Sequence, residues 1–224
     1  GLARIEKALK AIGSPCSKIP AIQVAGTNGK GSITSFIEST LRIANIRVGV
    51  TTSPHLISWC ERICFEGDLI QEKDFCQLIL SLEKISKSFN LTTFELVIAA
   101  ALKYFSERNA QLLVLEVGLG GRLDATTSHP YRPIIAMGSI GLDHCETLGG
   151  KLHQIATEKA AVISKKSIVI SSKQHPIVAE ILKKKSLEQN AKLTWVTPLS
   201  KEWKLGLNGG VQRENAAVAK GALE

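Results

Sequence analysis

The chain has 224 residues, of which 44% are hydrophobic and 21% charged, so it is long enough to bury a core and is expected to form one large globular domain. The 28 Lys and Arg residues exceed the 20 Asp and Glu residues, and the net charge of +8 favours anionic partners without choosing among them. An aromatic content of only 5% argues against a nucleic-acid partner, and the lack of any apolar run of roughly 18 residues argues against a membrane span.

Apolar runs alternate with helical patterns along the chain. Strands are predicted at residues 19–25, 46–52, 110–117, 133–140, 167–172 and 192–197. Helices are predicted at residues 32–43, 72–88, 93–107, 152–164 and 176–189. This alternation is typical of an α/β domain with a largely parallel sheet that helices cover on both faces.

Both ends of the chain are expected to be cut from a longer protein. The sequence opens on a helical pattern and stops inside another, "RENAAVAKGALE" (213–224). The apolar face of this last segment has nothing after it to cap it. That face consists of Ala216, Ala217, Ala219 and Leu223.

The N-terminus and the cysteines favour a cytoplasmic protein. The first residues, "GLARIEKALK", carry charges where a signal peptide would be apolar. Five cysteines are scattered without a Cys-x-x-Cys pair or a histidine at zinc-finger spacing. We therefore expect reduced, structural thiols.

The segment "VAGTNGKGS" (24–32) lies between a predicted buried strand and a predicted helix. Gly26 and Gly29 permit a tight turn, and the helix N-terminus would direct backbone amides at phosphate oxygens. Lys30 would neutralise the β- and γ-phosphates, while the Ser32 hydroxyl would bond to phosphate or support magnesium. Only two residues separate Gly26 from Gly29, which departs from the usual P-loop spacing. A P-loop-type nucleotide site is the favoured interpretation over a plain glycine-rich turn.

Polar residues follow two later strands at the edge where open α/β sheets bind ligands. Glu116 ends one apolar run, and His144 follows the next strand in "SIGLDH". In "LEVGLGGRLDA" (115–125), Arg122 can bind a carboxylate or phosphate. A local ion pair between Arg122 and Asp124 that shapes the loop is equally consistent with the sequence.

The loop "VAGTNGKGS" resembles the nucleotide loop of the folylpolyglutamate synthase and dihydrofolate synthase family, within the Mur ligase superfamily. Four further stretches carry the same resemblance and, with the loop, cover most of the chain. They are "TTSPHLISWCERI" (51–63), "TTFELVIAAALKYF" (92–105), "LEVGLGGRLDAT" (115–126) and "IGLDHCETLGGKLHQIATEKAAVI" (140–163). The resemblance implies that residues 1–224 are the ATP-binding, Mur-ligase-like central domain, and that a C-terminal ligase domain of roughly 130 to 150 residues is absent from this chain.

The resemblance also implies a magnesium site. The family's metal ligands map onto Ser53, Glu116, His144 and, through a carbamate, Lys159. A hydroxyl and a carboxylate are hard oxygen donors suited to this ion. A salt bridge of Lys159 with Glu158 or Glu116 is the alternative for that lysine. Lys30, His144 and Lys159 are the residues expected to take part in catalysis.

The remaining expected site residues would bind the nucleotide or the acceptor. By resemblance, the loop residues Gly26, Thr27, Asn28, Gly29, Lys30, Gly31 and Ser32 hold the phosphates, and Asn215 turns toward adenine. Val211 stands where the family often has a histidine, so adenine contacts there are open. Substrate contacts are expected from His55, Phe94, Arg122 and Asp124, although His55 is equally suited to capping its loop.

The function implied is an ATP-dependent ligase that joins L-glutamate to a folate or dihydropteroate carboxylate through an acyl phosphate, with ATP and Mg²⁺. The expected partners are these small molecules, and the enzyme is expected to be a cytoplasmic monomer with no membrane or nucleic-acid partner. Two alternatives remain. One is a truncated, non-catalytic nucleotide-binding module; the other is another Mur-type amino-acid ligase, which "TSPHL" and "GLGGRLDAT" disfavour.

Overall fold

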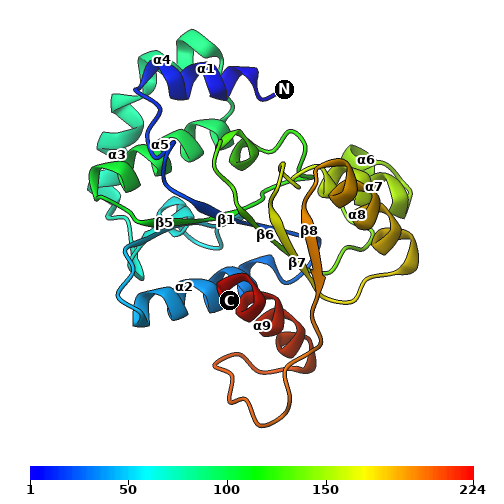
Figure 1. Cartoon of the computed structure of the whole chain (residues 1–224). Coiled ribbons are helices and arrows are strands. Elements are labelled where there is room, and N and C mark those ends of the chain that lie inside the picture. The colour runs from blue at the N-terminus through cyan, green and yellow to red at the C-terminus, as the bar shows by residue number, and fades with distance from the viewer.

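A computed structural model describes residues 1–224, and it is built on one eight-stranded sheet with the strand order β4-β3-β2-β5-β1-β6-β7-β8 (Figure 1). Six neighbouring strands, from β2 to β8 in that order, are parallel, while β3 and β4 add an antiparallel edge. The strands are β1 (Ala21–Ala25), β2 (Val48–Thr51), β3 (Ile63–Phe65), β4 (Asp68–Leu69), β5 (Leu112–Glu116), β6 (Ile134–Met137), β7 (Ile168–Ser171) and β8 (Lys192–Trp195). All six predicted strands are confirmed.

Helices cover both faces of the sheet, which confirms the predicted fold class (Figure 1). Helices α1, α5, α7 and α8 pack on one face, and α2 and α9 pack on the other. The helices are α1 (Ala3–Ala11), α2 (Lys30–Ile43), α3 (Glu72–Ser81), α4 (Glu83–Phe89), α5 (Thr93–Glu107), α6 (Cys145–Leu148), α7 (Leu152–Ala160), α8 (Pro176–Glu188) and α9 (Gly210–Leu223).

The central strand β1 shows why the sheet is covered twice. Its side chains alternate between the two faces, as the pleat requires. Ile22 and Val24 belong to the core under α2 and α9, while Ala21 and Ala25 belong to the cores on the opposite face. All five residues of β1 are buried and four of them are apolar, Gln23 being the exception, so the strand lacks an alternating pattern, as parallel sheets favour.

The predicted helix at residues 72–88 is wrong in one respect, because the structure divides it at Leu82 into α3 and α4. Leu82 is only 2% exposed. The break lets the two helices pack on different neighbours, since α3 packs on α5 and α4 packs on α1. A straight helix could not bury both contacts.

The β3–β4 hairpin was not predicted. Its strands are three and two residues long, too short for a clear period in the sequence. The turn between them places Glu66 at φ 53° and Gly67 at φ 92°. Two consecutive positive φ angles are the signature of a tight hairpin turn, so the "EG" dipeptide was the available signal.

The last helix corrects one part of the argument about the chain ends. Ala216, Ala217 and Ala219 are at most 5% exposed. Helix α9 lies against α2 and the ends of β6 and β7 (Figure 1). This apolar face is therefore covered within the chain.

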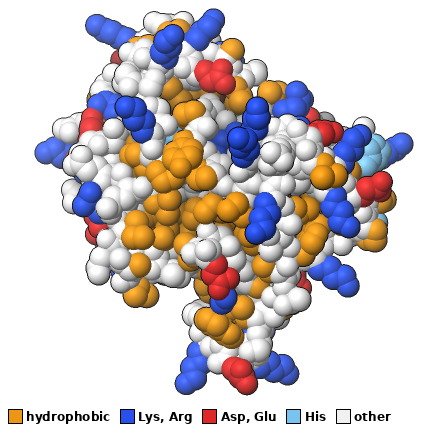
Figure 2. Space-filling view, viewed as in Figure 1, with side chains coloured by type: hydrophobic (Ala, Val, Ile, Leu, Met, Phe, Trp, Pro, Cys, Tyr) orange, Lys and Arg blue, Asp and Glu red, His pale blue; other side chains and the backbone are white.

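The surface and the cysteines add three observations. All five cysteines are free thiols, as expected. None of the helices is long and apolar enough to cross a membrane. Figure 2 shows Lys and Arg side chains spread around the rim of the face in view, with hydrophobic side chains grouped toward its middle.

Candidate functional site: a phosphate loop beside a cavity

The phosphate loop joins β1 to α2 and depends on close backbone packing. Gly26 has φ 141° and Gly29 has φ 82°, both in the region that favours glycine. A Cβ on Gly26 would lie 3.1 Å from backbone atoms of Gly138, and one on Gly29 would lie 2.3 Å from Oδ1 of Asn215. Asn215 is buried against this loop, and its Nδ2 donates to Oε1 of Gln212.

The loop's backbone amides fall into two groups. The amides of Thr27 and Asn28 donate to the carbonyl of Ser139, at 2.7 and 3.3 Å, and so fix the loop to the segment after β6. The amides of Lys30, Gly31 and Ser32 begin α2 and have no acceptor in the chain. The amides without an acceptor are therefore in the first turn of α2, while those of Thr27 and Asn28 hold the loop to the segment after β6.

Lys30 lies over the loop. Its Nζ donates to the carbonyls of Gly26 (3.3 Å) and Thr27 (3.1 Å). This places its charge at the helix N-terminus, beside the free amides. A lysine at this position can neutralise phosphate oxygens bound by those amides.

Glu116 ends β5 next to the loop and is only 4% exposed. Burial raises the pKa of its carboxyl to about 7, and the positive charge of Lys30 and a hydrogen bond from the Ser53 amide oppose the rise. The Ser53 hydroxyl is buried and has no hydrogen-bond partner in the chain. A buried carboxylate and an orphaned hydroxyl side by side are hard oxygen donors, so this pair fits a magnesium ion.

The other two expected metal ligands, His144 and Lys159, both lie beside Asp143. His144 Nε2 is 3.5 Å from Asp143, and Lys159 Nζ is 3.9 Å from the same carboxylate. Lys159 is 2% exposed and donates to the Gly26 carbonyl at 2.9 Å. Burial, helped by the charge of Lys30, lowers the pKa of Lys159 to about 8, against the charges of Asp143 and Asp124.

No cluster of three or more His, Cys, Asp and Glu side chains is arranged to hold a metal ion alone. A magnesium ion here would therefore need oxygen ligands from the bound nucleotide and from water, as this ion commonly does. Lys159 also does not pair with Glu158 or Glu116, the two partners considered from the sequence. Its neighbours are the loop carbonyl and Asp143.

Five of the expected site residues line a cavity of about 680 Å³. They are Ser53, Phe94, Arg122, Asp124 and His144. The ring of Phe94 lies against Gly118, where a Cβ would be 2.7 Å from its Cζ. Glycine at this position therefore lets an aromatic ring form part of the cavity wall.

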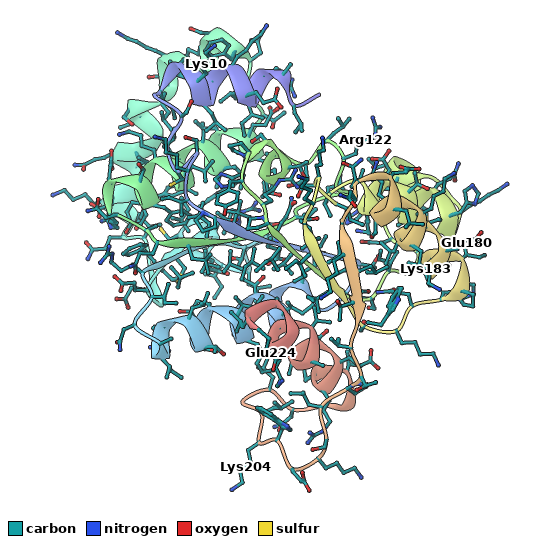
Figure 3. All side chains as sticks on the ribbon, in the orientation of Figure 1. Lys10, Arg122, Glu180, Lys183, Lys204 and Glu224 are labelled. Atoms are coloured by element: carbon teal, nitrogen blue, oxygen red, sulfur yellow. The ribbon has the colours of Figure 1, made fainter.

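Arg122 and Asp124 do not form the ion pair considered from the sequence. Arg122 Nε donates to Glu158 at 2.9 Å (Figure 3 shows Arg122 on the side of the molecule near α7). The carboxylate of Asp124 accepts from the amides of Gly118, Leu119 and Thr126 and from the Thr126 hydroxyl. Asp124 thus shapes the wall of the cavity, and burial raises its pKa against these hydrogen bonds.

His55 does not line the cavity, but it forms a hydrogen bond with Arg62, which does. Its Nδ1 accepts a hydrogen bond of 2.8 Å from Nε of Arg62. Arg62, Arg4 and Glu95 are lining residues that the sequence analysis missed. Arg62 stood in the quoted stretch "TTSPHLISWCERI", but nothing in its spacing distinguished it from a surface arginine.

The fold and the site together define a nucleotide-binding α/β domain. Its glycine-rich loop follows the first strand of a parallel sheet, a buried carboxylate lies at the carboxyl edge, and Ser53 and Asp124, which both influence that carboxylate, line a cavity.

Residues 24–220 match the Mur ligase middle domain, and the chain belongs to this family. It is 34% identical to the dihydrofolate synthetase of Saccharomyces cerevisiae over all of this chain and 57% of that protein. It is 35% identical to the dihydrofolate synthase/folylpolyglutamate synthase of Bacillus subtilis, over 82% of this chain and 44% of that protein. The chain therefore spans about half the length of these relatives.

A solved structure agrees. The folylpolyglutamate synthase of Mycobacterium tuberculosis, complexed with ADP and AMPPCP, superposes on all of this chain and 58% of its own, with a TM-score of 0.93 and 28% identity. The resemblance inferred from five sequence stretches is confirmed at the level of family and fold.

Proposed function

We propose that this chain is the ATP-binding portion of a ligase that joins L-glutamate to the carboxylate of a folate or dihydropteroate. The relatives named above support this class of reaction. The observation that carries the proposal is the adjacency of two sites. The Ser53 amide is close enough to the Glu116 carboxyl to lower its pKa, and Ser53 also lines the 680 Å³ cavity, so a phosphate and an acceptor would meet there.

ATP is proposed to bind with its phosphates at the start of α2. The free amides of Lys30, Gly31 and Ser32 would hold the oxygens, and the Lys30 ammonium would turn from the loop carbonyls to the β- and γ-phosphates. Asn215, packed against Gly29, would approach the adenine. A folylpolyglutamate synthase with AMPPCP and folate superposes on 99% of this chain with a TM-score of 0.88 and 26% identity, which supports a shared site for the two ligands.

The proposed reaction has two steps. An oxygen of the acceptor carboxylate attacks the γ-phosphorus, the bond to the β-phosphate oxygen breaks, and ADP leaves. The amine of glutamate then attacks the acyl carbon, inorganic phosphate leaves, and the nitrogen loses a proton. Lys30 would hold the γ-phosphate in line for the first step, and positive charge beside the acyl oxygen would stabilise the second.

Magnesium, when bound, would supply positive charge that offsets the negative charge built up on the phosphates during transfer. Ser53 and Glu116 would hold it, since one offers an orphaned hydroxyl and the other a buried carboxylate. His144, next to Asp143 at the cavity wall, is proposed as a further ligand that approaches when nucleotide is bound.

Lys159 is proposed to carry a carbamate. Its pKa of about 8 leaves more neutral amine at physiological pH than an exposed lysine would have, and a neutral amine is the form that adds to carbon dioxide. Carbon-13 NMR of the chain in labelled bicarbonate should show a carbamate signal that Lys159→Arg lacks. Identical spectra for the two proteins would refute the carbamate.

The acceptor is proposed to bind in the cavity, with its bicyclic ring against Phe94 and Gly118. Arg122 would contact the acceptor's polar groups, while Asp124 would act by shaping the wall. A C-terminal domain in the whole protein is proposed to bind glutamate and close the site. The same proposal places the enzyme in the cytoplasm as a monomer.

A calorimetric titration tests the adjacency of the two sites. The chain is saturated with AMPPCP and magnesium and then titrated with pteroate, a stable acceptor that carries the reacting carboxylate. We expect pteroate to bind the nucleotide complex, because the phosphate loop and the cavity are separate spaces. Competition between the two ligands, or no pteroate binding in either state, would refute the proposal.

A further inference from the structure

The charged residues that line the cavity are almost all paired. Of its three acidic residues, Glu95 binds Arg4 (3.2 Å), Glu158 binds Arg122 (2.9 Å), and Asp124 accepts four hydrogen bonds. Arg62 is the remaining arginine of the lining. It forms no ion pair, and its two terminal nitrogens donate no hydrogen bond in the chain. The cavity therefore has one cation whose charge no carboxylate balances.

Neighbouring side chains orient Arg62. Its Nε donates to Nδ1 of His55 at 2.8 Å, and its guanidinium lies 4.8 Å from the centre of the Trp59 ring. The rings of His55 and Trp59 are 4.6 Å apart. Both neighbours are uncharged when His55 accepts this bond, so they direct the guanidinium without neutralising it.

The nearest carboxylate in the sequence, that of Glu61, is turned away. Glu61 accepts hydrogen bonds from the amides of Leu56, Ile57 and Ser58, at 2.8, 2.8 and 2.7 Å. These bonds lower its pKa, so it remains an anion committed to the loop. Partial burial lowers the pKa of Arg62, in keeping with a cation that has lost some water and gained no counter-ion.

We propose that Arg62 binds a carboxylate of the acceptor other than the one that reacts, and thereby favours acceptors that already carry glutamate. The inference rests on the proposed function. Pteroate and dihydropteroate have a single carboxylate, which must face the phosphate loop. A glutamylated acceptor has a second carboxylate, the α-carboxylate of its terminal glutamate, and this group needs a cation inside the cavity.

The position of Arg62 favours the acceptor over ATP as its partner. The phosphates are served by Lys30 and the first-turn amides of α2. Arg62 instead lines the same cavity as Thr92, Phe94 and Leu119, which offer apolar surface to a bicyclic ring. A planar guanidinium with two free nitrogens can bind a carboxylate through two parallel hydrogen bonds.

His55 is a positioning residue in this arrangement. It touches Arg62 rather than the cavity, and it holds the inner nitrogen so that the outer edge of the guanidinium faces the ligand. Replacing His55 by Phe keeps the aromatic contact with Trp59 but removes the acceptor. This variant should lose part of the preference that Arg62 confers, and Arg62→Gln should lose all of it.

The test is a cycle of two proteins and two ligands, measured as binding to this chain with AMPPCP and magnesium present. The ligands are pteroylglutamate and its α-amide, which differ only in the charge of the α-carboxyl group. Wild type should bind pteroylglutamate roughly tenfold to a hundredfold more tightly than the α-amide, the effect of one charge-assisted contact. Arg62→Gln should bind the two ligands with equal affinity.

Controls separate this inference from the proposed function. The γ-amide of pteroylglutamate keeps the α-carboxylate, so wild type should bind it without the loss of affinity seen for the α-amide. Arg4→Gln, on the same wall but paired with Glu95, should keep the wild-type preference. An undiminished preference in Arg62→Gln, or equal weakening for pteroate and pteroylglutamate, would overturn the role of Arg62 alone. Failure of wild type to bind any of these ligands would overturn both.

Discussion

Two glycine-rich segments, residues 26–32 and residues 118–127, meet at the carboxyl edge of the sheet. They differ in whether their polar groups have hydrogen-bond partners within the chain. In the first, three backbone amides have no acceptor in the chain, and the nearby Ser53 hydroxyl has no partner. In the second, Asp124 satisfies three amides and a hydroxyl. Thr127 closes the same segment by donating to the Gly121 carbonyl.

This difference indicates which segment binds a ligand and which one shapes the cavity. Polar groups that lack partners reduce the stability of a fold, and they persist where a ligand supplies the partner. Groups that satisfy one another stabilise a loop and leave little for a ligand. Residues 26–32 are therefore the proposed phosphate-binding segment, and residues 118–127 form part of the cavity wall. Substitutions in the two segments should change different quantities.

The largest effect is expected in the wall. Asp124→Ala leaves three amides without their acceptor, that of Thr126 fully buried, and should lower the free energy of unfolding by about 3 kcal/mol, the range expected for loss of a buried, multiply bonded carboxylate. Asp124→Asn keeps one acceptor oxygen and should cost about half as much. Urea denaturation followed by circular dichroism measures both. Equal stability of Asp124→Ala and wild type would contradict a shaping role.

The matching substitution, in residues 26–32, should leave the free energy of unfolding unchanged. Lys30→Ala removes a charge-assisted contact to phosphate worth about 1.5 to 3 kcal/mol and should weaken ATP binding tenfold to a hundredfold. Its urea midpoint should stay close to that of wild type, since Lys30 bonds only to loop carbonyls. Calorimetry with Mg-ATP measures the affinity. An unchanged dissociation constant would show that residues 26–32 are only a turn.

A smaller effect concerns the buried carboxylate beside the binding segment. The pKa of Glu116 is about 7 in the fold and about 4.5 when unfolded, so the folded state holds more protons between these values. Stability should therefore fall as pH rises from 4.5 through 7. With a chelator present at pH 8, Glu116→Gln should be more stable than wild type by about 1 to 2 kcal/mol.

The pH series supplies the control for that prediction. The stabilities of Glu116→Gln and wild type should converge as pH falls toward 4.5, because wild-type Glu116 is then protonated and neutral. A constant gap between the two proteins at all pH values would mean that packing, and not ionisation, separates them.

The smallest effect is expected at the rim of the cavity. Arg122 is more than half exposed in its ion pair with Glu158, and exposed pairs contribute little. Arg122→Gln should change the free energy of unfolding by less than about 1 kcal/mol, as judged by urea denaturation. A loss as large as that of Asp124→Ala would show that the rim, too, supports the wall.

The fold was largely predictable because the sequence patterns that produce its strands and helices are local. The buried strands are apolar runs, and the helices between them have clear periods and starts, such as the Thr92 and Glu95 capping box at the N-terminus of α5. The break at Leu82 was not predictable, since it depends on α3 and α4 packing against different helices. The β3–β4 edge is too short to produce a pattern.

The site was predictable where the backbone defines it. Gly26, Gly29 and Lys30 stand in a motif whose spacing follows from the turn itself. Side-chain pairings were not predictable, because they join segments far apart in the sequence. Arg122 pairs with Glu158, and Lys159 reaches the Gly26 carbonyl. Arg62 lies only seven residues from His55, but nothing in that spacing distinguishes it from a surface arginine, so its place in the cavity was not predictable.

The most direct test of the account is a calorimetric titration of the chain with ATP, with magnesium and then with a chelator in its place. If the free amides of α2, Ser53 and Glu116 form one site, magnesium should tighten ATP binding to wild type and have little effect on Glu116→Gln. Equal affinity of the wild-type chain for ATP with and without magnesium would contradict the claim that these unpartnered groups are a metal-nucleotide site.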